Sequence, residues 1–298
     1  MSKISKVITS RATNLIYKIT VAFTQNAYSK DCYHLDYEDK RYREKELISI
    51  LYHCLPFFAL TPQEFKKFRE NDDNVESLRL SWQRISSTDP LKKGDYGELL
   101  LFILLEIFYP ARKFVTKVRL RTSQGDQIKG FDCAHFTIEK GEPVLWLGEA
   151  KFTESISNAI NKAFSSLSTH LDHAYIHKEI DILASNIEYN YNEDDTIDES
   201  FKILEDFLTA KTSIDKIKFK IPILLTYDST CVNSNFEISS NFQSEISTEL
   251  EKISNKIEEK KIDTKLKVDF IFLILPLKSL SWIKQELNKL ELISKTYA

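Results

Sequence analysis

The chain has 298 residues, 41 lysines and arginines against 44 acidic residues, and a formal net charge of −3. This length suits one large or two modest domains with a soluble, globular composition. No run of about 18 apolar residues occurs, and the start lacks the apolar core of a secretory signal, so we expect neither a membrane span nor export. The overall charge argues neither for nor against a polyanionic partner, because local patches of charged residues decide such binding.

The first 85 residues carry no recognisable chemistry. Residues 14–23 are typical of a strand, and residues 42–55 have the spacing of a helix. Thr61 followed by Glu64 forms a capping-box pattern, which predicts a second helix start. We therefore predict a mixed, mostly helical N-terminal region over residues 1–85, offering contact to a partner or to DNA.

The middle of the chain concentrates the residues with special backbone freedom. All six glycines fall between residues 94 and 148. Residues 94–109 are apolar almost all round, which predicts a buried helix that Pro110 ends. Residues 113–121 alternate as a strand does, and residues 129–138 and 143–152 predict two more strands joined by a tight turn.

The rest of the chain alternates helices and strands. Residues 154–180 predict one long helix, residues 188–200 an acidic loop and residues 201–210 a short helix. The apolar runs 217–229 and 267–277 predict buried strands, separated by a charged helix near 243–261 and followed by a closing helix. This order is typical of an α/β protein.

Asp132, Glu149 and Lys151 lie among apolar residues within the segment 129–152. Glu149 and Lys151 are two residues apart on a strand, so they share a face. If Lys140 and Gly141 form the hairpin tip, paired residue numbers sum to 281 and Asp132 lies opposite Glu149. The β-carbons of such a pair are roughly 5 Å apart.

Two carboxylates this close repel each other unless a cation lies between them. Mg²⁺ or Mn²⁺ prefers oxygen ligands and suits such a pair. Lys151 would polarise an attacking water or steady negative charge at phosphorus. Two acids, one lysine and a metal ion are a working set for phosphodiester hydrolysis.

The motif also resembles a known signature. "GFD" followed after a hairpin by "GEAK", with a glutamate-bearing helix before it, resembles the D…ExK core of restriction-endonuclease-like nucleases. Four segments within residues 94–290 are "GDYGELLLFILLE", "KGFDCAH", "LWLGEAKF" and "IPILLTYDS". In these segments the sequence resembles the HamA family, the nuclease subunits of the Hachiman anti-phage system.

The resemblance implies a fold, an activity and a partner. We expect a restriction-endonuclease-like mixed sheet flanked by helices over residues 86–298. The implied function is a metal-dependent DNA nuclease in the prokaryotic cytoplasm, held in check by a HamB-like helicase in a heterodimer. No ATPase motif of the form GxxxxGK[ST] occurs in this chain, so motor function would belong to the partner.

The family's catalytic residues carry over position by position. Its core acids match Asp132 and Glu149, its lysine matches Lys151, and Glu98 matches the extra glutamate that many such nucleases place beside the metal. The implied metal ligands are Asp132, Glu149 and Glu98. Phe131 occupies the position before the aspartate where the family motif often, but not always, has a proline.

A basic stretch precedes the site. No acid occurs between Ile107 and Gly125, and a basic strand beside the acidic pair would hold phosphates. An ordinary charged edge strand explains the same pattern equally well. The candidate nucleic-acid contacts are Lys113, Lys117, Arg119, Arg121 and Lys129.

Plainer interpretations accompany the remaining candidates. His170, His173 and His177 share one face of the predicted helix, where a solvated or core-edge helix face is favoured over zinc because no carboxylate or cysteine completes a ligand set nearby. His135, Cys133 and the other three cysteines are interpreted as packing residues with reduced thiols. The run "EDD" at 193–195 is interpreted as part of a solvated loop.

Alternative functions remain beside the nuclease. A buried ion network would also place Asp132, Glu149 and Lys151 together, but three charges on one face are hard to explain by stability. A catalytically inactive nuclease-fold subunit that binds nucleic acid or a partner is the main alternative. A stand-alone restriction-type enzyme is disfavoured because no recognition domain is evident.

Overall fold

The computed structural model describes residues 4–85, 94–109, 111–116, 118, 130–186, 199–209 and 216–296. Its centre is a seven-stranded mixed sheet with the strand order β1-β2-β9-β8-β7-β6-β5. The strands are β1 (Ile16–Ile19), β2 (Ser29–Leu35), β5 (Arg112–Thr116), β6 (Cys133–Glu139), β7 (Glu142–Phe152), β8 (Lys218–Asp228) and β9 (Lys267–Leu277). β2, β9, β8 and β7 run parallel to one another, whereas β1 pairs antiparallel with β2, and β6 pairs antiparallel with both β7 and β5.

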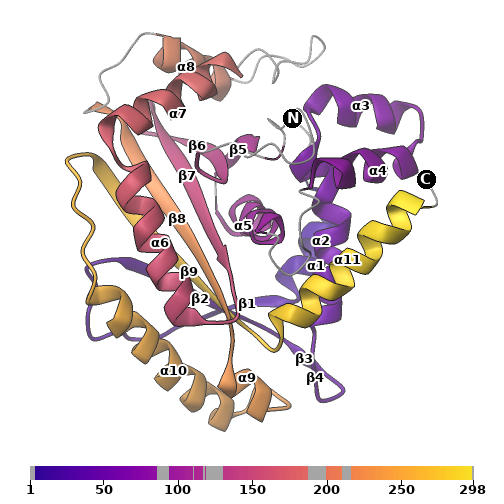
Figure 1. Ribbon diagram of the computed structural model, residues 1–298, viewed down its shortest axis with the longest axis vertical. Coiled ribbons are helices and arrows are strands. Elements are labelled where there is room, and N and C mark those ends of the chain that lie inside the picture. Colours follow the sequence, from indigo (N-terminus) through magenta and orange to yellow (C-terminus); the bar gives the residue numbers. More distant parts are fainter. Residues whose placement is uncertain are drawn as a thin grey trace.

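Helices cover both faces of the sheet, as Figure 1 shows. On one side lie α6 (Ile156–His170), α7 (His173–Ser185), α8 (Glu199–Thr209), α9 (Thr230–Ser234) and α10 (Ser240–Glu258). On the other lie α1 (Lys6–Thr13), α2 (Glu44–Ala59), α3 (Pro62–Glu70), α4 (Asn74–Arg84), α5 (Asp95–Phe108) and α11 (Leu280–Thr296). A separate small hairpin consists of β3 (Tyr37–Glu38) and β4 (Arg41–Tyr42).

The predicted α/β class with a mixed sheet flanked by helices is confirmed. The strand predicted at 267–277 coincides with β9, and the one at 217–229 covers β8. Thr61 and Glu64 form the predicted capping box at the start of α3. None of the described helices is both long and apolar enough to span a bilayer.

Helix α5 is buried on every side, as its composition predicts. Residues 95–105 are all shielded from solvent. The helix contacts β7 on one side and α2 on the other, so it has no solvent face on which charged residues would be required. It places Glu98 close behind the central strands.

The N-terminal region belongs to the same sheet as the rest of the chain. β2, which the sequence analysis did not predict, pairs in parallel with β9, and Ser29 lies opposite Ile271. Helix α2 contacts α5 and α11. Residues 1–85, which the sequence analysis set apart, therefore supply two strands and several helices to the core that carries the candidate site.

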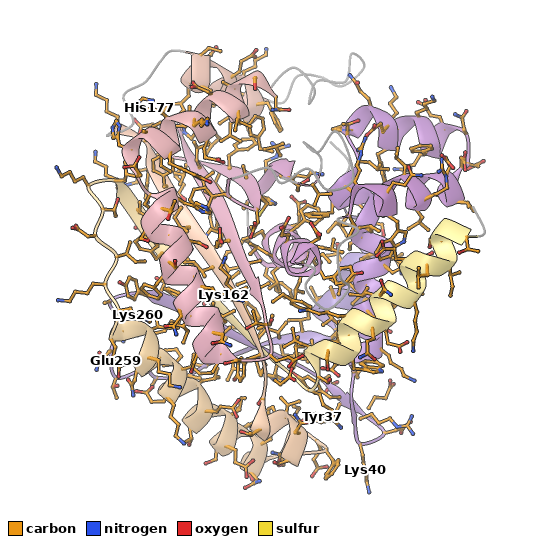
Figure 2. All side chains as sticks on the ribbon, viewed as in Figure 1. Tyr37, Lys40, Lys162, His177, Glu259 and Lys260 are labelled. Carbon is orange, nitrogen blue, oxygen red and sulfur yellow. The ribbon has the colours of Figure 1, made fainter. Side chains whose placement is uncertain are left out.

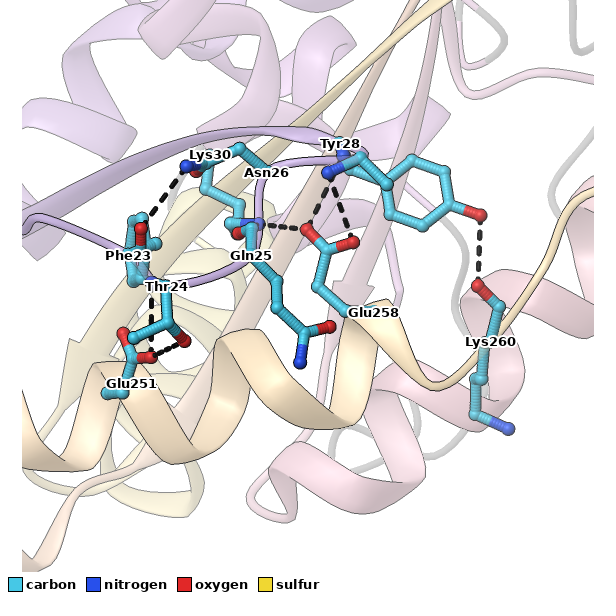
Figure 3. A network of polar contacts seen from close by, with 10 residues as sticks. Phe23, Thr24, Gln25, Asn26, Tyr28, Lys30, Glu251, Glu258 and Lys260 are labelled. Atoms are coloured by element: carbon cyan, nitrogen blue, oxygen red, sulfur yellow. Dashed lines mark hydrogen bonds and ion pairs between the residues drawn. The ribbon is translucent and has the colours of Figure 1, made fainter.

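A buried polar network fastens the segment before β2 to α10 (Figure 3). Lys30 forms an ion pair with Glu258, and the two side chains are only 1% and 2% exposed. The Glu258 carboxylate also accepts hydrogen bonds from the backbone N–H groups of Ala27 and Tyr28, at 3.2 and 3.4 Å. Lys30 donates a further bond to the Gln25 carbonyl at 2.9 Å, so both charges are fully engaged.

The long helix predicted over 154–180 is wrong in one respect, because two helices occupy this segment. α6 ends at His170, and the side chain of Asp172 accepts hydrogen bonds from the N–H groups of Ala174 and Tyr175 to begin α7. An aspartate that caps a new helix competes with continuation of the old one. The break turns α7 and its residues in a new direction.

Candidate active site at the end of the central hairpin

The hairpin of β6 and β7 has the predicted register. Lys140 and Gly141 both have positive φ, at 54° and 85°, as a primed two-residue turn requires. Ile138 lies opposite Pro143 and Cys133 opposite Gly148, so paired numbers sum to 281. The register is therefore confirmed along the whole of β6.

Asp132 lies directly before β6 and is fixed against β7. Its N–H donates to the Gly148 carbonyl at 2.9 Å, and its Oδ2 accepts from the Ala150 N–H at 2.8 Å. The residue is 7% exposed. These two bonds hold its carboxylate beside the strand segment that carries Glu149.

Glu149 and Lys151 point to the same face of β7, and α6 covers them. The Lys151 ammonium contacts Glu149 Oε1 and donates to Ser166 Oγ of α6 at 3.0 Å. The Glu149 side chain is 3% exposed, whereas that of Lys151 is 15% exposed. The lysine therefore keeps contact with solvent while its carboxylate partner is buried.

His170 is a site residue that the sequence analysis missed. Its Nδ1 lies 3.4 Å from Glu149 Oε2. The imidazole stacks on Tyr175 with ring centroids 4.8 Å apart, and the edge of Phe131 contacts it at 5.1 Å. The helix break after α6 separates it from His173 and His177, whose rings lie together on α7, where His177 is exposed (Figure 2).

The pKa of the Glu149 carboxyl is lowered although the group is buried. Burial alone would raise the pKa, but the close contact of His170 and the charge and hydrogen bond of Lys151 outweigh it. Opposite charges within a few ångströms favour the ionised form in this way. Glu149 is therefore a carboxylate at neutral pH.

Tyr175 contributes a hydroxyl group to the same site. Burial, and after it the nearby carboxylates of Glu179, Glu149 and Asp132, together raise its pKa to about 12. The hydroxyl oxygen is buried, and it has no hydrogen-bond partner among the residues that the structure describes. The phenol is consequently neutral and able to donate.

Glu98 approaches from the opposite layer of the fold. A Cβ at Gly97 would lie 2.6 Å from Cβ of Phe152, so glycine lets α5 lie directly against β7. The pKa of the Cys133 thiol is raised first by burial, then by Asp132 and Glu98, and less by Glu149. All three acids therefore approach Cys133, with Glu98 behind the sheet.

The donor set partly fits a hard divalent ion. Asp132 and Glu149 offer carboxylate oxygens from neighbouring strands, and Glu149 is ionised, which suits Mg²⁺ or Mn²⁺. Across the described ranges, however, no three His, Cys, Asp or Glu side chains are grouped to hold a metal ion. Asp132 and Glu149 thus form a two-carboxylate site, and Glu98 is a third acid nearby. The Lys151 ammonium contacts one oxygen of Glu149.

Lys113 is the one candidate nucleic-acid contact that lies within the described residues. Lys113 is only 9% exposed, and its ammonium donates to the carbonyls of Phe57 and Phe58 at the end of α2. It therefore stabilises the core and is not positioned to hold a phosphate. β5 ends at Thr116, and Lys117, Arg119, Arg121 and Lys129 lie outside the described residues, as does the "EDD" run.

The residues interpreted as packing are buried. His135 is fully shielded and tilted against the Phe102 ring, and burial lowers its pKa to about 3. All four cysteines are buried thiols. These side chains support the sheet and have no access to solvent.

Comparison with known proteins identifies the family of the chain over nearly its whole length. No curated protein matches the sequence. The sequence model of the HamA family matches residues 13–290. The match begins far upstream of residue 94, so it includes the N-terminal strands that complete the sheet. The chain therefore belongs to the HamA family, the family of a component of the Hachiman anti-phage defence system.

Proposed function

We propose that this chain is a metal-dependent DNA nuclease, the effector of a prokaryotic, cytoplasmic defence complex. The observation that carries the proposal is the convergence of Asp132, Glu149 and Lys151 at the end of the β6–β7 hairpin. A buried, ionised glutamate beside a partly exposed lysine suits a site that meets a charged ligand better than it suits a closed core.

The order of elements supports a restriction-endonuclease-like core. Helix α5 is followed by the antiparallel strands β5, β6 and β7, then by α6 and the parallel strand β8. This arrangement places the acids and the lysine on the middle strands, with one helix layer on each face. We propose that residues 94–277 form this core, which β1 and β2 extend.

Each residue has a role in the proposed hydrolysis. Asp132 and Glu149 would hold Mg²⁺ or Mn²⁺, and a bound ion of this kind supplies Lewis acidity and a more acidic water. Lys151, held by Ser166, donates to the phosphate and stabilises the negative charge that develops there. His170 Nδ1 lies 3.4 Å from the second oxygen of Glu149, so that its positive charge, when the ring is protonated, favours the carboxylate.

The test is cleavage of plasmid DNA by the purified protein in Mg²⁺, in Mn²⁺ and in EDTA. We expect cleavage with either ion and none in EDTA. Lys151→Met should reduce the rate about 100- to 1000-fold, because one donor to the transition state is lost. Lys289→Met is the matched control, since Lys289 is 64% exposed on α11 and pairs with Glu286. Cleavage by Lys151→Met at the wild-type rate would refute the assignment.

The proposed restraint by a helicase is tested separately. We expect a HamB-like helicase encoded with this chain to co-elute with it from size-exclusion chromatography and to reduce its cleavage of intact plasmid. Separate elution of the two proteins would contradict the heterodimer while leaving the nuclease assignment standing.

A catalytically inactive subunit that only binds is the second candidate. The contact between Lys151 and Glu149 and the lack of a three-ligand group in the described ranges favour it. Under this alternative, DNA binding would persist, EDTA would not change it, and no condition would give cleavage.

A further inference from the structure

The Tyr175 hydroxyl is a buried donor whose role the fold does not explain. Within the described part of the chain it makes no hydrogen bond, although buried polar groups in proteins are nearly always paired. An unpaired buried group costs stability. Such a group in a candidate active site therefore suggests a partner that arrives with a ligand.

Three segments fix the position of the Tyr175 ring. His170, the last residue of α6, stacks on it with an interplanar angle of 19°. The cap at Asp172 accepts the N–H of Tyr175 itself at 3.3 Å. Phe131, which directly precedes Asp132, packs edge to face with His170 at a centroid distance of 5.1 Å. The ring is therefore held before any ligand binds, so little entropy is lost when its hydroxyl is used.

The surroundings of the hydroxyl select the chemistry of that ligand. Burial and the nearby carboxylates of Glu179, Glu149 and Asp132 raise its pKa, so the phenol stays protonated and donates. A neutral donor among acids accommodates an acceptor-only anion without adding positive charge. The non-bridging oxygens of a phosphodiester are acceptors of this kind.

We propose that Tyr175 contacts the substrate of this site: its hydroxyl donates a hydrogen bond to a non-bridging oxygen of the nucleic-acid backbone beside Asp132 and Glu149. The inference rests on the proposed function and adds to it a residue outside the acid-acid-lysine motif. His170 acts as a positioning residue that holds both the Tyr175 ring and the Glu149 carboxylate.

The test compares Tyr175→Phe with a control variant of a second tyrosine, Tyr37, whose hydroxyl does make a hydrogen bond. Tyr37 of β3 donates its hydroxyl to the Val232 carbonyl at 2.9 Å, and it lies at the other end of the molecule from His177 of α7 (Figure 2). Tyr37→Phe should therefore lower Tm and leave cleavage unchanged. Tyr175→Phe removes an unpaired hydroxyl, so its Tm should equal or exceed that of the wild type.

The function of Tyr175 is read from cleavage and from binding. In Mg²⁺, Tyr175→Phe should lower kcat/KM about 10- to 100-fold, as expected for loss of a hydrogen bond to a charged group. In Ca²⁺, binding of a short fluorescent DNA duplex, measured by anisotropy, should weaken. The salt dependence of binding should keep its slope, because no charged contact is lost.

Each outcome bears on the proposal. Wild-type binding and kcat/KM in Tyr175→Phe, or a Tm that falls together with activity, would overturn it and leave the nuclease intact. If the wild type binds the duplex but does not cut it, and Tyr175→Phe weakens binding, the contact stands and the nuclease assignment fails. A wild type that neither binds nor cuts DNA overturns both.

Discussion

Two buried lysine–glutamate pairs in this molecule have the same chemistry and different surroundings. Lys30 and Glu258 are 1% and 2% exposed, and backbone N–H groups and a carbonyl complete their hydrogen bonding (Figure 3). Lys151 is 15% exposed, and the second oxygen of its partner Glu149 has only a 3.4 Å contact with His170.

The difference separates a structural pair from a site. A closed network leaves no group available to a ligand, whereas the Glu149 pair keeps a solvent-accessible cation and a weakly engaged carboxylate oxygen. Ion pairs alone are therefore poor guides to function, and the completeness of their hydrogen bonding is the better criterion.

The largest effect should come from breaking the closed pair. Lys30→Met leaves Glu258 buried without its cation and should destabilise the protein by about 3–5 kcal/mol. Lys151→Met should cost about 2 kcal/mol less, because a partly exposed lysine contributes less through its ion pair and His170 remains near Glu149. Urea unfolding measures both values.

A second variant sharpens this prediction. Glu258→Gln added to Lys30→Met should recover part of the loss, since an amide oxygen still accepts from the N–H groups of Ala27 and Tyr28. Equal destabilisation by Lys30→Met and Lys151→Met would show that the two pairs do not differ as described.

A buried carboxylate that is held by backbone N–H groups extends the comparison. Glu44 is 4% exposed and accepts the N–H groups of Lys278 and Ser279. Burial raises its pKa from 4.5 to about 7, with a further contribution from Asp228. Between these two values the folded protein holds a proton that the unfolded chain releases, so stability falls as pH rises through this window.

Glu44→Gln should remove the loss of stability between pH 4.5 and about 7. The variant should match the wild type near pH 5 and exceed its stability by up to about 3 kcal/mol at pH 8, as the shift of the pKa implies. Urea unfolding at both pH values provides the measurement. If the stability difference between variant and wild type is the same at pH 5 and pH 8, Glu44 is not the source.

The smallest effect concerns Asp132 without metal. Asp132→Asn keeps an oxygen that accepts the Ala150 N–H and removes one negative charge from the acidic site, so its Tm in EDTA should lie at or slightly above that of the wild type. Mg²⁺ or Mn²⁺ should raise the wild-type Tm and leave the variant unchanged. A strongly destabilised variant, with a wild-type Tm that ignores both ions, would favour a purely structural ion network.

Local signals in the sequence specified the hairpin and its charged residues. The turn at Lys140 and Gly141 sets the register, and alternation then assigns Glu149 and Lys151 to one face. Both signals act within about 20 residues of the chain, so no tertiary information is needed to interpret them.

Features that depend on distant contacts were not predictable in this way. β2 has few strand-favouring residues and is ordered by pairing with β9, a tertiary effect that outweighs local propensity. Asp172 was read as a residue inside a helix, although it begins a new one. That error hid His170 and Tyr175, whose rings stack because their helices change direction at Leu171.

The pairing of β2 with β9 also governs how the protein can be synthesised. β9, the partner of β2 on its inner side, emerges from the ribosome more than 200 residues later, and such a non-local pairing slows folding. A chain that stops before β9 leaves β2 and β8 with open edges and cannot complete the sheet. Translation must therefore pass Leu277 before the candidate catalytic strands gain their full support, so a prematurely terminated chain does not build the complete site.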